Sequence, residues 1–292
     1  MTSVAAALEP ARVRRHRRGA AGRLLRRPTA IVAFAVVAVL VIAAVAAPLV
    51  APYPKNQFDY THLFAGPSLA HPFGQDELGR DLLTRAMYGG RTSLEIAALA
   101  TALAMVGGSL WGFAAAFRRG WGDEVLMRIA DLTLGLPVIL LGLVLVAAFG
   151  SSTPSLVLIL GILFMPATAR LARSALLSEL EQEYYLAAVA VGAPAWRIAL
   201  GELLPNTMPV LLARASIVAA DAIFVEASLS FVGLGVQPPA ASWGTLLERG
   251  YVVLYRNYWY AIFPGLMILL AVLALNVLGD NLQRVLDPAK RS

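Results

Sequence analysis

The chain has 292 residues, of which 59% are hydrophobic and 14% charged, and its mean hydropathy is +0.70. A soluble domain carries about 25% charged residues, so this chain has too few charges to cover a soluble globule. The composition therefore predicts a membrane protein. The chain has no cysteine, which excludes disulfides, thiolate metal sites and cysteine nucleophiles.

The net charge of +6 is concentrated near the N-terminus, where eight arginines in residues 1–28 are opposed only by Glu9. A basic tail often indicates nucleic-acid binding. Beside a hydrophobic span, however, it is typical of a cytoplasmic retention signal that also contacts anionic lipid. We therefore expect membrane lipid, and no nucleic acid, among the partners.

Apolar stretches long enough to cross the hydrocarbon of a bilayer recur along the chain. The third contains Pro137, where we expect a kink. The pattern predicts an all-α membrane protein with a six-span domain over 29–281. The six predicted spans are 29–51, 92–117, 129–149, 156–176, 207–232 and 258–279.

The segments between these spans are polar. We expect tails without a membrane span at both ends, a short charged turn early in the chain, and polar intervals elsewhere. These segments are 1–28, 52–91, 118–128, 150–155, 177–206, 233–257 and 282–292.

Orientation follows from the Lys and Arg residues in alternate connections, since cytoplasmic loops carry the excess. With the N-terminus inside, the inner segments hold seventeen, counting the third of them from Arg170 at the end of the fourth span, and the outer segments hold six. We therefore expect both termini and the 177–206 loop to face the cytoplasm.

Residues 183–206 form the one long amphipathic, charge-bearing segment between two spans. Pro194, two residues after Gly192, ends a first helix, because proline cannot continue the hydrogen-bond ladder. We expect a second short helix over 195–203, ended by Leu204-Pro205. The result is a helix, a tight turn and a helix outside the bilayer, which a second protein can bind.

This pattern resembles the coupling loop of binding-protein-dependent ABC importer permeases, written E-A-A, three residues, Gly, then a spacer to Leu-Pro. Leu186 stands where the motif has its glutamate, and Glu202 where a hydrophobic residue is expected. Either Glu183 takes that role or the loop tolerates its loss. The expected ATPase-coupling residues are Glu183, Tyr184, Ala187, Ala188, Gly192, Arg197, Leu204 and Pro205.

A second stretch, residues 71–94, is similar to the H-x-F-G-T-D-x-x-G-R-D segment of the second permease of dipeptide, oligopeptide and nickel importers (the DppC/OppC type). The plainer interpretation is a helix capped by Asp76 or Gln75 with basic residues later, and both interpretations can hold. His71 beside Pro72 is not expected to bind metal. The matching residues are His71, Phe73, Gly74, Asp76, Gly79, Arg80 and Asp81.

A third stretch, residues 225–247, is similar to the E-A-x-L-S-F-L-G-L-G-x-x-P-P-x-x-x-W-G segment of the same permeases. We expect the glycines to break the helix, the prolines to hold the chain extended, and the tryptophan to lie at the membrane interface. Together they would form an outer lip over a central pathway. The residues are Gly233, Gly235, Pro238, Pro239 and Trp243.

Arg214, Asp221 and Glu226 are ionisable residues in the fifth predicted span. Such residues are expensive in a membrane and usually face protein or a wet cavity. Arg214 and Asp221 lie nearly on one face and are expected to pair through a water or with a partner chain, whereas Glu226 points elsewhere. Contact between two permeases, contact with the transported peptide, and a proton relay remain open.

The resemblance implies a type I ABC importer permease fold, with the coupling helix between spans 4 and 5. It also implies a heterodimer with a second permease, two ATPase subunits and an extracytoplasmic binding protein. The chain lacks the G-x-x-x-x-G-K-[ST] phosphate loop, so ATP and Mg are expected on the ATPases. The chain itself is expected to be non-catalytic. Dipeptides, oligopeptides, nickel chelates and haem remain candidate substrates.

Three other classes fit less well. An ion-coupled secondary transporter needs a site in broken helices at mid-membrane, and this chain has few acids there. A membrane enzyme needs a nucleophile with a base or a metal cluster, but no predicted span contains any of the three histidines. An ABC exporter usually carries its ATPase in the same chain and lacks this loop.

Overall fold

The computed structural model describes residue 22 and residues 27–118 and 120–286. The predicted N-terminal tail therefore lies almost wholly outside the described residues, as does 287–292. Within the described ranges the regular elements are helices, and the only strand-like feature is an isolated bridge between Gln75 and Asp81.

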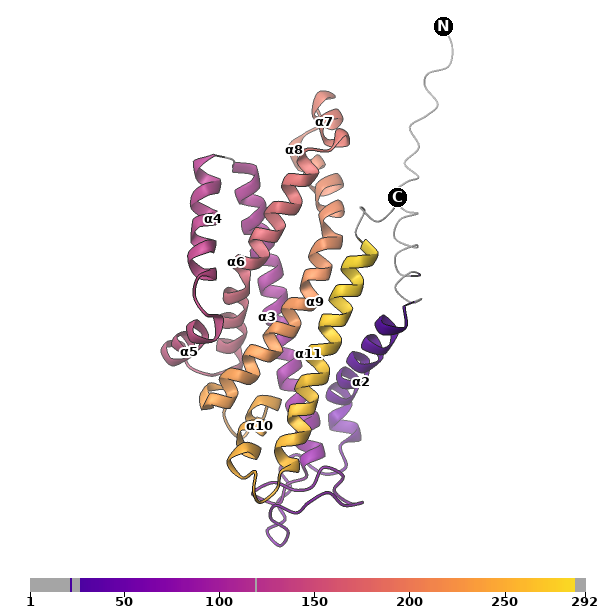
Figure 1. The fold of residues 1–292 in the computed structure, drawn as a ribbon, viewed down its shortest axis with the longest axis vertical. Coiled ribbons are helices and arrows are strands. Elements are labelled where there is room, and N and C mark those ends of the chain that lie inside the picture. The colour runs from indigo at the N-terminus through magenta and orange to yellow at the C-terminus, as the bar shows by residue number, and fades with distance from the viewer. Residues whose placement is uncertain (1–21, 23–26, 119, 287–292) are drawn as a thin grey trace.

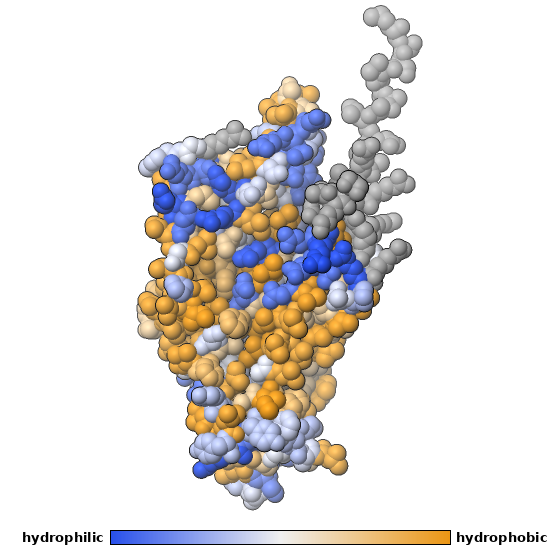
Figure 2. All heavy atoms as spheres, viewed as in Figure 1, coloured by the Kyte–Doolittle hydropathy of each residue, from blue (hydrophilic) through white to orange (hydrophobic). Residues whose placement is uncertain are grey.

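Long helices lie side by side in a bundle (Figure 1). In the part of the chain that the structure describes, five helices are long and apolar enough to cross a membrane, and α4 with α5 adds a sixth if that bent pair crosses once. Figure 2 shows a hydrophobic band across the middle of the molecule with hydrophilic surface toward both ends, as the sequence predicts. The five long helices are α2 (Pro28–Val50), α3 (Leu82–Arg118), α6 (Thr153–Leu180), α9 (Leu204–Leu229) and α11 (Trp259–Leu286).

The core is built around α3 and α6, which pack closely because small residues line their contact. A Cβ on Gly112 would lie 2.2 Å from the carbonyl oxygen of Ala169, and one on Gly108 would lie 2.6 Å from the Thr168 Cβ. Such close approach is typical of membrane helix pairs. Large side chains from α3, α6 and α9 fill the centre beside this contact, among them Ile96, Leu156, Leu160, Ile223 and Leu229.

The two ends of the bundle differ. We call one the α7 end, because the short helices α7 (Glu183–Ala190) and α8 (Ala195–Ile198) project from it (Figure 1). The N-terminal end of α2 and the C-terminal end of α11 also point toward it. A hydrogen bond joins these two helix ends, since Arg27 Nη1 donates to Asn281 Oδ1 at 3.4 Å. The opposite end, here called the α10 end, carries the 51–81 loop and α10 (Trp243–Val252).

The predicted charged turn over 118–128 is wrong, and the predicted third span over 129–149 is divided into two helices that meet at a sharp bend. A helix, α4 (Trp121–Leu134), begins inside the predicted turn, and its first-turn acids Asp123 and Glu124 favour a helix N-terminus. The chain then breaks before Pro137 and bends by 90° into α5 (Val138–Phe149). Pro137 therefore separates two helices, where we expected a kink within one span.

The prediction that Leu204-Pro205 ends the second short helix is also wrong. Helix α8 continues through a π-helical turn, η1 (Ala199–Leu203), directly into α9. Pro205 is tolerated because it lies in the first turn of α9, and the wider π turn makes the change of hydrogen-bond register.

The interval over 233–257 contains a helix that we did not predict, α10. The break at its start is confirmed: α9 passes into a π turn, η2 (Ser230–Leu234), and Gly233 adopts φ +86°. Pro238 and Pro239 lie in a turn, where we expected extended chain. At the C-terminus, α11 runs to Leu286, so 282–286 belongs to this helix and not to a tail.

Candidate functional site

The turn between α7 and α8 follows from its residues. Helix α7 ends at Ala190 with Val191 as its C-cap, and Gly192 takes the left-handed conformation, with φ +73°. The Gly192 N–H donates to the Val189 carbonyl at 3.0 Å and the Ala193 N–H to the Ala188 carbonyl at 3.1 Å. These two bonds form a Schellman motif, which ends helices at glycine. The predicted helix–turn–helix is confirmed in its first half.

A small apolar cluster anchors this projection to the bundle. Ile198 and Leu203 are buried against Leu176 and Leu180 of α6 and Ala116 of α3. Tyr185, Ala188 and Ala193 pack on the same cluster. A force on α7 or α8 is therefore transmitted to α3 and α6 through packed side chains.

Tyr184 adds a polar anchor, since its hydroxyl donates to Glu179 Oε2 at 2.6 Å. Burial, followed by this hydrogen bond to a carboxylate, raises the pKa of Tyr184 to about 12. The tyrosine therefore stays protonated and remains a donor at neutral pH.

The tip of the projection exposes apolar side chains that our motif comparison did not select. Val191 is 83% exposed and Trp196 is 68% exposed. Figure 2 shows hydrophobic atoms at the tip, above hydrophilic ones. An exposed apolar patch rimmed by polar residues marks a protein contact. Leu186, Val189 and Leu200 are also exposed. The signal in the sequence was the presence of large apolar residues in a segment between two spans.

The predicted coupling residues occupy three environments. Leu204 lines a groove described below. Ala188 and Tyr184 are half-buried anchors. The remaining residues are exposed on or near the projection: Glu183, Ala187, Gly192, Arg197 and Pro205.

At the α10 end, the motif residues from 71 to 81 fold into one buried polar cluster. The Asp76 carboxylate accepts hydrogen bonds from the Leu78 and Arg80 N–H groups at 2.9 Å and from Arg80 Nε at 2.6 Å. Arg85 Nε lies 3.5 Å from the same carboxylate. Asp76 therefore shapes the loop and does not cap α3.

The cap of α3 is Asp81, contrary to our expectation of Asp76 or Gln75. Asp81 Oδ2 accepts from the Thr84 N–H at 2.7 Å, and Asp81 Oδ1 lies 2.9 Å from His71 Nδ1. Gly79 has φ +70°, and a Cβ there would lie 1.9 Å from the Asp59 carbonyl oxygen. Gly74 is likewise left-handed, and Phe73 stacks on Phe263 with ring centroids 4.0 Å apart.

Glu77, which we did not select, is the hub that ties this cluster to α10 and α11. Its carboxylate accepts from Arg80 Nη2 at 3.0 Å, from Arg249 Nη1 at 2.9 Å and from the Tyr260 hydroxyl at 2.8 Å. Arg80 is a close neighbour in the sequence, but Arg249 and Tyr260 lie far along the chain, so the sequence alone could not reveal this arrangement.

The three charges predicted in the fifth span separate into two environments. Arg214 and Asp221 are half-buried on α9, and the Arg214 Nε has no hydrogen-bond partner within the described residues. Both residues lie on one face of α9 together with residues that recur at alternating steps of four and three along the helix. No residue of this face is buried. The other members of this face are Val210, Ile217, Phe224 and Ser228.

Glu226 corrects our expectation of a pathway or partner contact, because it is 1% exposed within this single chain. Its carboxylate accepts from Ser230 Oγ at 2.7 Å and from Ser93 Oγ at 3.1 Å. The prediction that it serves a different neighbour from Asp221 is confirmed.

Trp243 is also placed differently from our expectation. It is fully buried, where we expected it at the membrane interface, and its ring packs on Gly90. Its Nε1–H donates to the Ala86 carbonyl at 2.9 Å. The Gly89-Gly90 pair in α3 was the available signal, because a Cβ on Gly90 would lie 2.7 Å from the indole.

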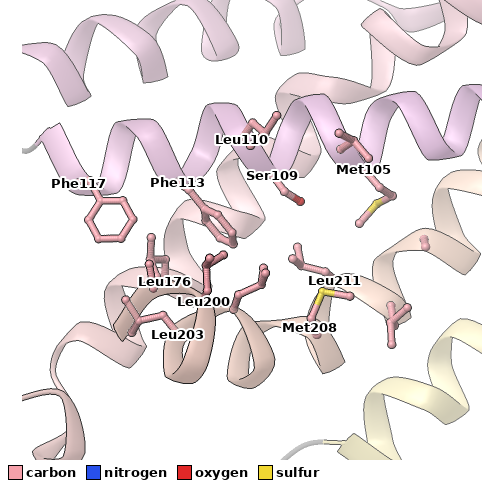
Figure 3. A pocket seen from close by; sticks show the side chains of 15 residues that line it. Met105, Ser109, Leu110, Phe113, Phe117, Leu176, Leu200, Leu203, Met208 and Leu211 are labelled. Atoms are coloured by element: carbon pink, nitrogen blue, oxygen red, sulfur yellow. The ribbon is translucent and has the colours of Figure 1, made fainter. Parts of the chain in front are cut away.

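An apolar groove of about 470 Å³ runs between α3 and the helix formed by η1 and α9. Figure 3 shows Phe113 and Phe117 of α3 facing Leu200 and Leu203 across it, with Ser109 as the one labelled polar side chain. Such a lining suits another apolar helix or lipid, and it does not suit a hydrophilic route. Within the described residues, no cluster of three or more His, Asp or Glu residues could hold a metal ion.

Comparison with known proteins agrees with these features. The family described as "Binding-protein-dependent transport system inner membrane component" matches residues 108–292, and "N-terminal TM domain of oligopeptide transport permease C" matches residues 17–67. A Brucella ovis protein whose name describes a peptide permease is 38% identical over 92% of this chain and 89% of its own length. A Pseudomonas aeruginosa di/tripeptide transport system permease protein is 37% identical over 94% and 89%.

Among solved structures, an inward-facing form of the MetNI methionine ABC transporter has a similar chain. The TM-score is 0.58 with 20% sequence identity, and the match covers 70% of this chain and 96% of that one. A second crystal form gives a TM-score of 0.57 with the same coverage. At this identity the likeness establishes the fold, which is the type I importer permease fold.

Proposed function

Because the chain belongs to the family of binding-protein-dependent transport system inner membrane components, we propose that it forms half of the translocation pathway of an ATP-driven peptide importer. The observation that carries this proposal is the α7–α8 projection, whose exposed apolar tip is anchored to α3 and α6. Membership of this family sets aside the ion-coupled transporter that the sequence left open.

The projection is the proposed contact with the ATPases. This chain has no phosphate loop of its own, so the energy comes from separate subunits that bind ATP and Mg. When two ATPases close on ATP, they displace α7 and α8, and the anchoring cluster carries the movement into α3 and α6. Binding of ATP to one conformation then shifts the spans between inward- and outward-facing states.

A second, homologous permease is the proposed partner within the membrane. The apolar groove between α3 and α9 is suited to a helix of that partner, because its lining gives an apolar side chain contacts on every side. The α9 face with Arg214 and Asp221 is the proposed wall of the pathway where the two permeases meet. These charges would be costly against lipid.

The α7 end is the proposed cytoplasmic end, with both termini on that side, because the basic residues gather in the segments assigned to it. The α10 end then faces outward and offers its rigid 71–81 cluster and α10 to an extracytoplasmic binding protein. Glu77 fixes these parts relative to one another through Arg80, Arg249 and Tyr260.

Di- and oligopeptides are the proposed substrates, on the strength of what the Brucella and Pseudomonas relatives are named for. The structure contributes one further argument: the opposite charges of Arg214 and Asp221, two helical turns apart, suit a pathway for zwitterions.

Co-purification tests the proposal most directly. The tagged chain is expressed with its genomic neighbours, solubilised in detergent and isolated, and the proteins that accompany it are identified. We expect a second permease and ATPase subunits, and ATP-dependent uptake of peptide after reconstitution with the binding protein. Recovery of the chain alone, active with only an ion gradient, would overturn the proposal.

A further inference from the structure

Glu226 is a buried carboxylate in a predicted membrane span, and the coupling mechanism gives it no task. It stands near the close of α9, where the helix gives way to η2 and the chain turns back toward α10. Its two oxygens accept hydrogen bonds from different elements, Ser93 on α3 and Ser230 at the start of η2.

The same hydrogen bonds extend to the start of α10. The backbone N–H of Trp243 donates to Ser93 Oγ at 3.1 Å. Ser242, whose hydroxyl accepts from the Thr245 N–H and so caps α10, has its Oγ 3.4 Å from Ser230 Oγ. A continuous path of donors therefore runs from the backbone of α10 through Ser93 to the carboxylate.

Close backbone packing surrounds these hydrogen bonds. A Cβ on Gly244 would lie 2.6 Å from the Ser230 Cβ and 2.7 Å from the Ala227 Cα, so α10 sits directly on the last turn of α9. Trp243 attaches the same segment to α3 through its ring and its bond to Ala86. Three elements meet here, and Glu226 is the carboxyl group among them.

The two oxygens of the Glu226 carboxyl group are the acceptors toward which the Ser93 and Ser230 hydroxyls donate. Without it, Ser93 would lose the acceptor of its hydroxyl, and Ser230 would keep only the Ser242 hydroxyl, 3.4 Å away. A buried donor left without an acceptor costs more than the bond itself contributes. A carboxylate is also expensive at this depth unless fully hydrogen-bonded. If the residue at position 226 only had to fill space, an apolar residue such as alanine would avoid this cost.

We propose that Glu226 is a positioning residue that fixes the segment 230–252, comprising η2 and α10, on α3. When it is fixed in this way, the segment forms the closed outer lip of the pathway. This assignment rests on the proposed function. The segment can leave α3 only when the hydrogen bonds to the buried Glu226 carboxyl group break. Because η2 and α10 are both held by these bonds, the segment moves as one unit.

The absence of native cysteine allows a clean accessibility test. Leu246→Cys places one thiol in the buried contact between α10 and α3, where the leucine is 0% exposed. Leu176→Cys places one in the buried cluster at the α7 end as a remote reporter. Each reporter is combined with Glu226→Ala, Glu226→Gln or the control Glu95→Ala, which removes an exposed glutamate two residues from Ser93.

The rate of labelling by a water-soluble maleimide is measured on the full-length chain, purified with its co-expressed partners. We expect Glu226→Ala to speed labelling at residue 246 by about tenfold or more, since local opening follows the loss of buried hydrogen bonds. Glu226→Gln, which keeps one of the two acceptor oxygens, should speed labelling less than Glu226→Ala, and Glu95→Ala should stay near the parent rate. Labelling at residue 176 should not change.

An unchanged rate at residue 246 in Glu226→Ala would overturn the proposal. An equal rise at both reporters would also overturn it, because the carboxylate would then support the whole fold and not this segment. Labelling involves no transport step, so its result is separate from the proposed function. A parent complex that imports no peptide would count against the latter alone.

Discussion

Gly192 is constrained by its backbone and not by its surroundings. It has φ +73°, and no atom lies within 4 Å of where a Cβ would be. An L-residue in this conformation costs about 1–2 kcal/mol, most for β-branched residues and least for asparagine. The turn that orients α7 against α8 therefore depends on a residue that accepts positive φ.

We expect Gly192→Val to reduce ATP-dependent uptake strongly while Gly192→Asn retains most of it, because only the valine displaces the turn. Uptake is normalised to the amount of chain in the membrane, which should match the parent for both variants. Equal uptake by the two variants would show that the turn geometry does not matter for coupling.

Glu77 makes the α10 end sensitive to acid. Burial alone would raise the pKa of Glu77, but a bond to its own backbone N–H, the Tyr260 hydroxyl and the charges of Arg249 and Arg80 together lower it below the ordinary 4.5. A depressed folded pKa contributes stability that is present above about pH 4.5 and is lost as the pH falls through the folded value.

We therefore expect Glu77→Gln to lower the unfolding temperature in detergent at neutral pH, and this difference from the parent to shrink below about pH 4.5. Glu248→Gln, a half-buried neighbour on α10, is the control for simple loss of one negative charge. A difference that stays constant from pH 7 to pH 3 would contradict this account.

At the scale of the elements, the contact between α3 and α6 limits what the bundle tolerates. The same substitution can be placed at two glycines inside long helices. A Cβ at Gly112 would lie 2.2 Å from the Ala169 carbonyl oxygen, whereas a Cβ at Gly265 meets only the Leu247 side chain, at 3.5 Å.

Gly112→Ala should destabilise the protein by about 1–3 kcal/mol, because the two helices must move apart. Gly265→Ala should be neutral or should stabilise by up to about 1 kcal/mol, through reduced freedom of the unfolded chain. Thermal unfolding of both variants in the same detergent checks this. Equal destabilisation would show that helix spacing is not set by Gly112.

The long helices were predictable because each carries a long apolar run, and sequence hydropathy registers such runs directly. The elements that were missed have mixed composition. Helix α10 contains Arg249 and Glu248 beside Trp243, so it resembles a polar interval until the tertiary contacts with Gly90 are known. Similarly, α4 is amphipathic, and its charges suggested a turn.

The candidate site was predictable where local geometry determines it, as at Gly192 and Gly233, whose positive φ follows from helix termination. It was not predictable where distant residues decide. The burial of Glu226 depends on Ser93, and the role of Glu77 depends on Arg249 and Tyr260. No spacing within one segment reveals such pairs.

At the scale of the whole molecule, two surfaces differ in how well they suit contact with lipid. The groove between α3 and α9 is apolar and suits either lipid or a helix. The face with Arg214 and Asp221 does not suit lipid, because half-buried charges there lack ion-pair partners among the described residues. This face of α9 is therefore the one that the proposed second permease would cover.

A double-mutant cycle tests whether Arg214 and Asp221 act together at that interface. We expect Arg214→Ala and Asp221→Ala each to reduce the amount of second permease that co-purifies, since each leaves the other charge uncompensated. The double variant should lose less than the sum, with a coupling of about 0.5–3 kcal/mol. Asp280→Ala, at an exposed acid on α11, is the control for a general loss of charge. Strictly additive losses would mean that the two charges serve separate neighbours, and the α9 face would then have to be divided between the partner and the transported peptide.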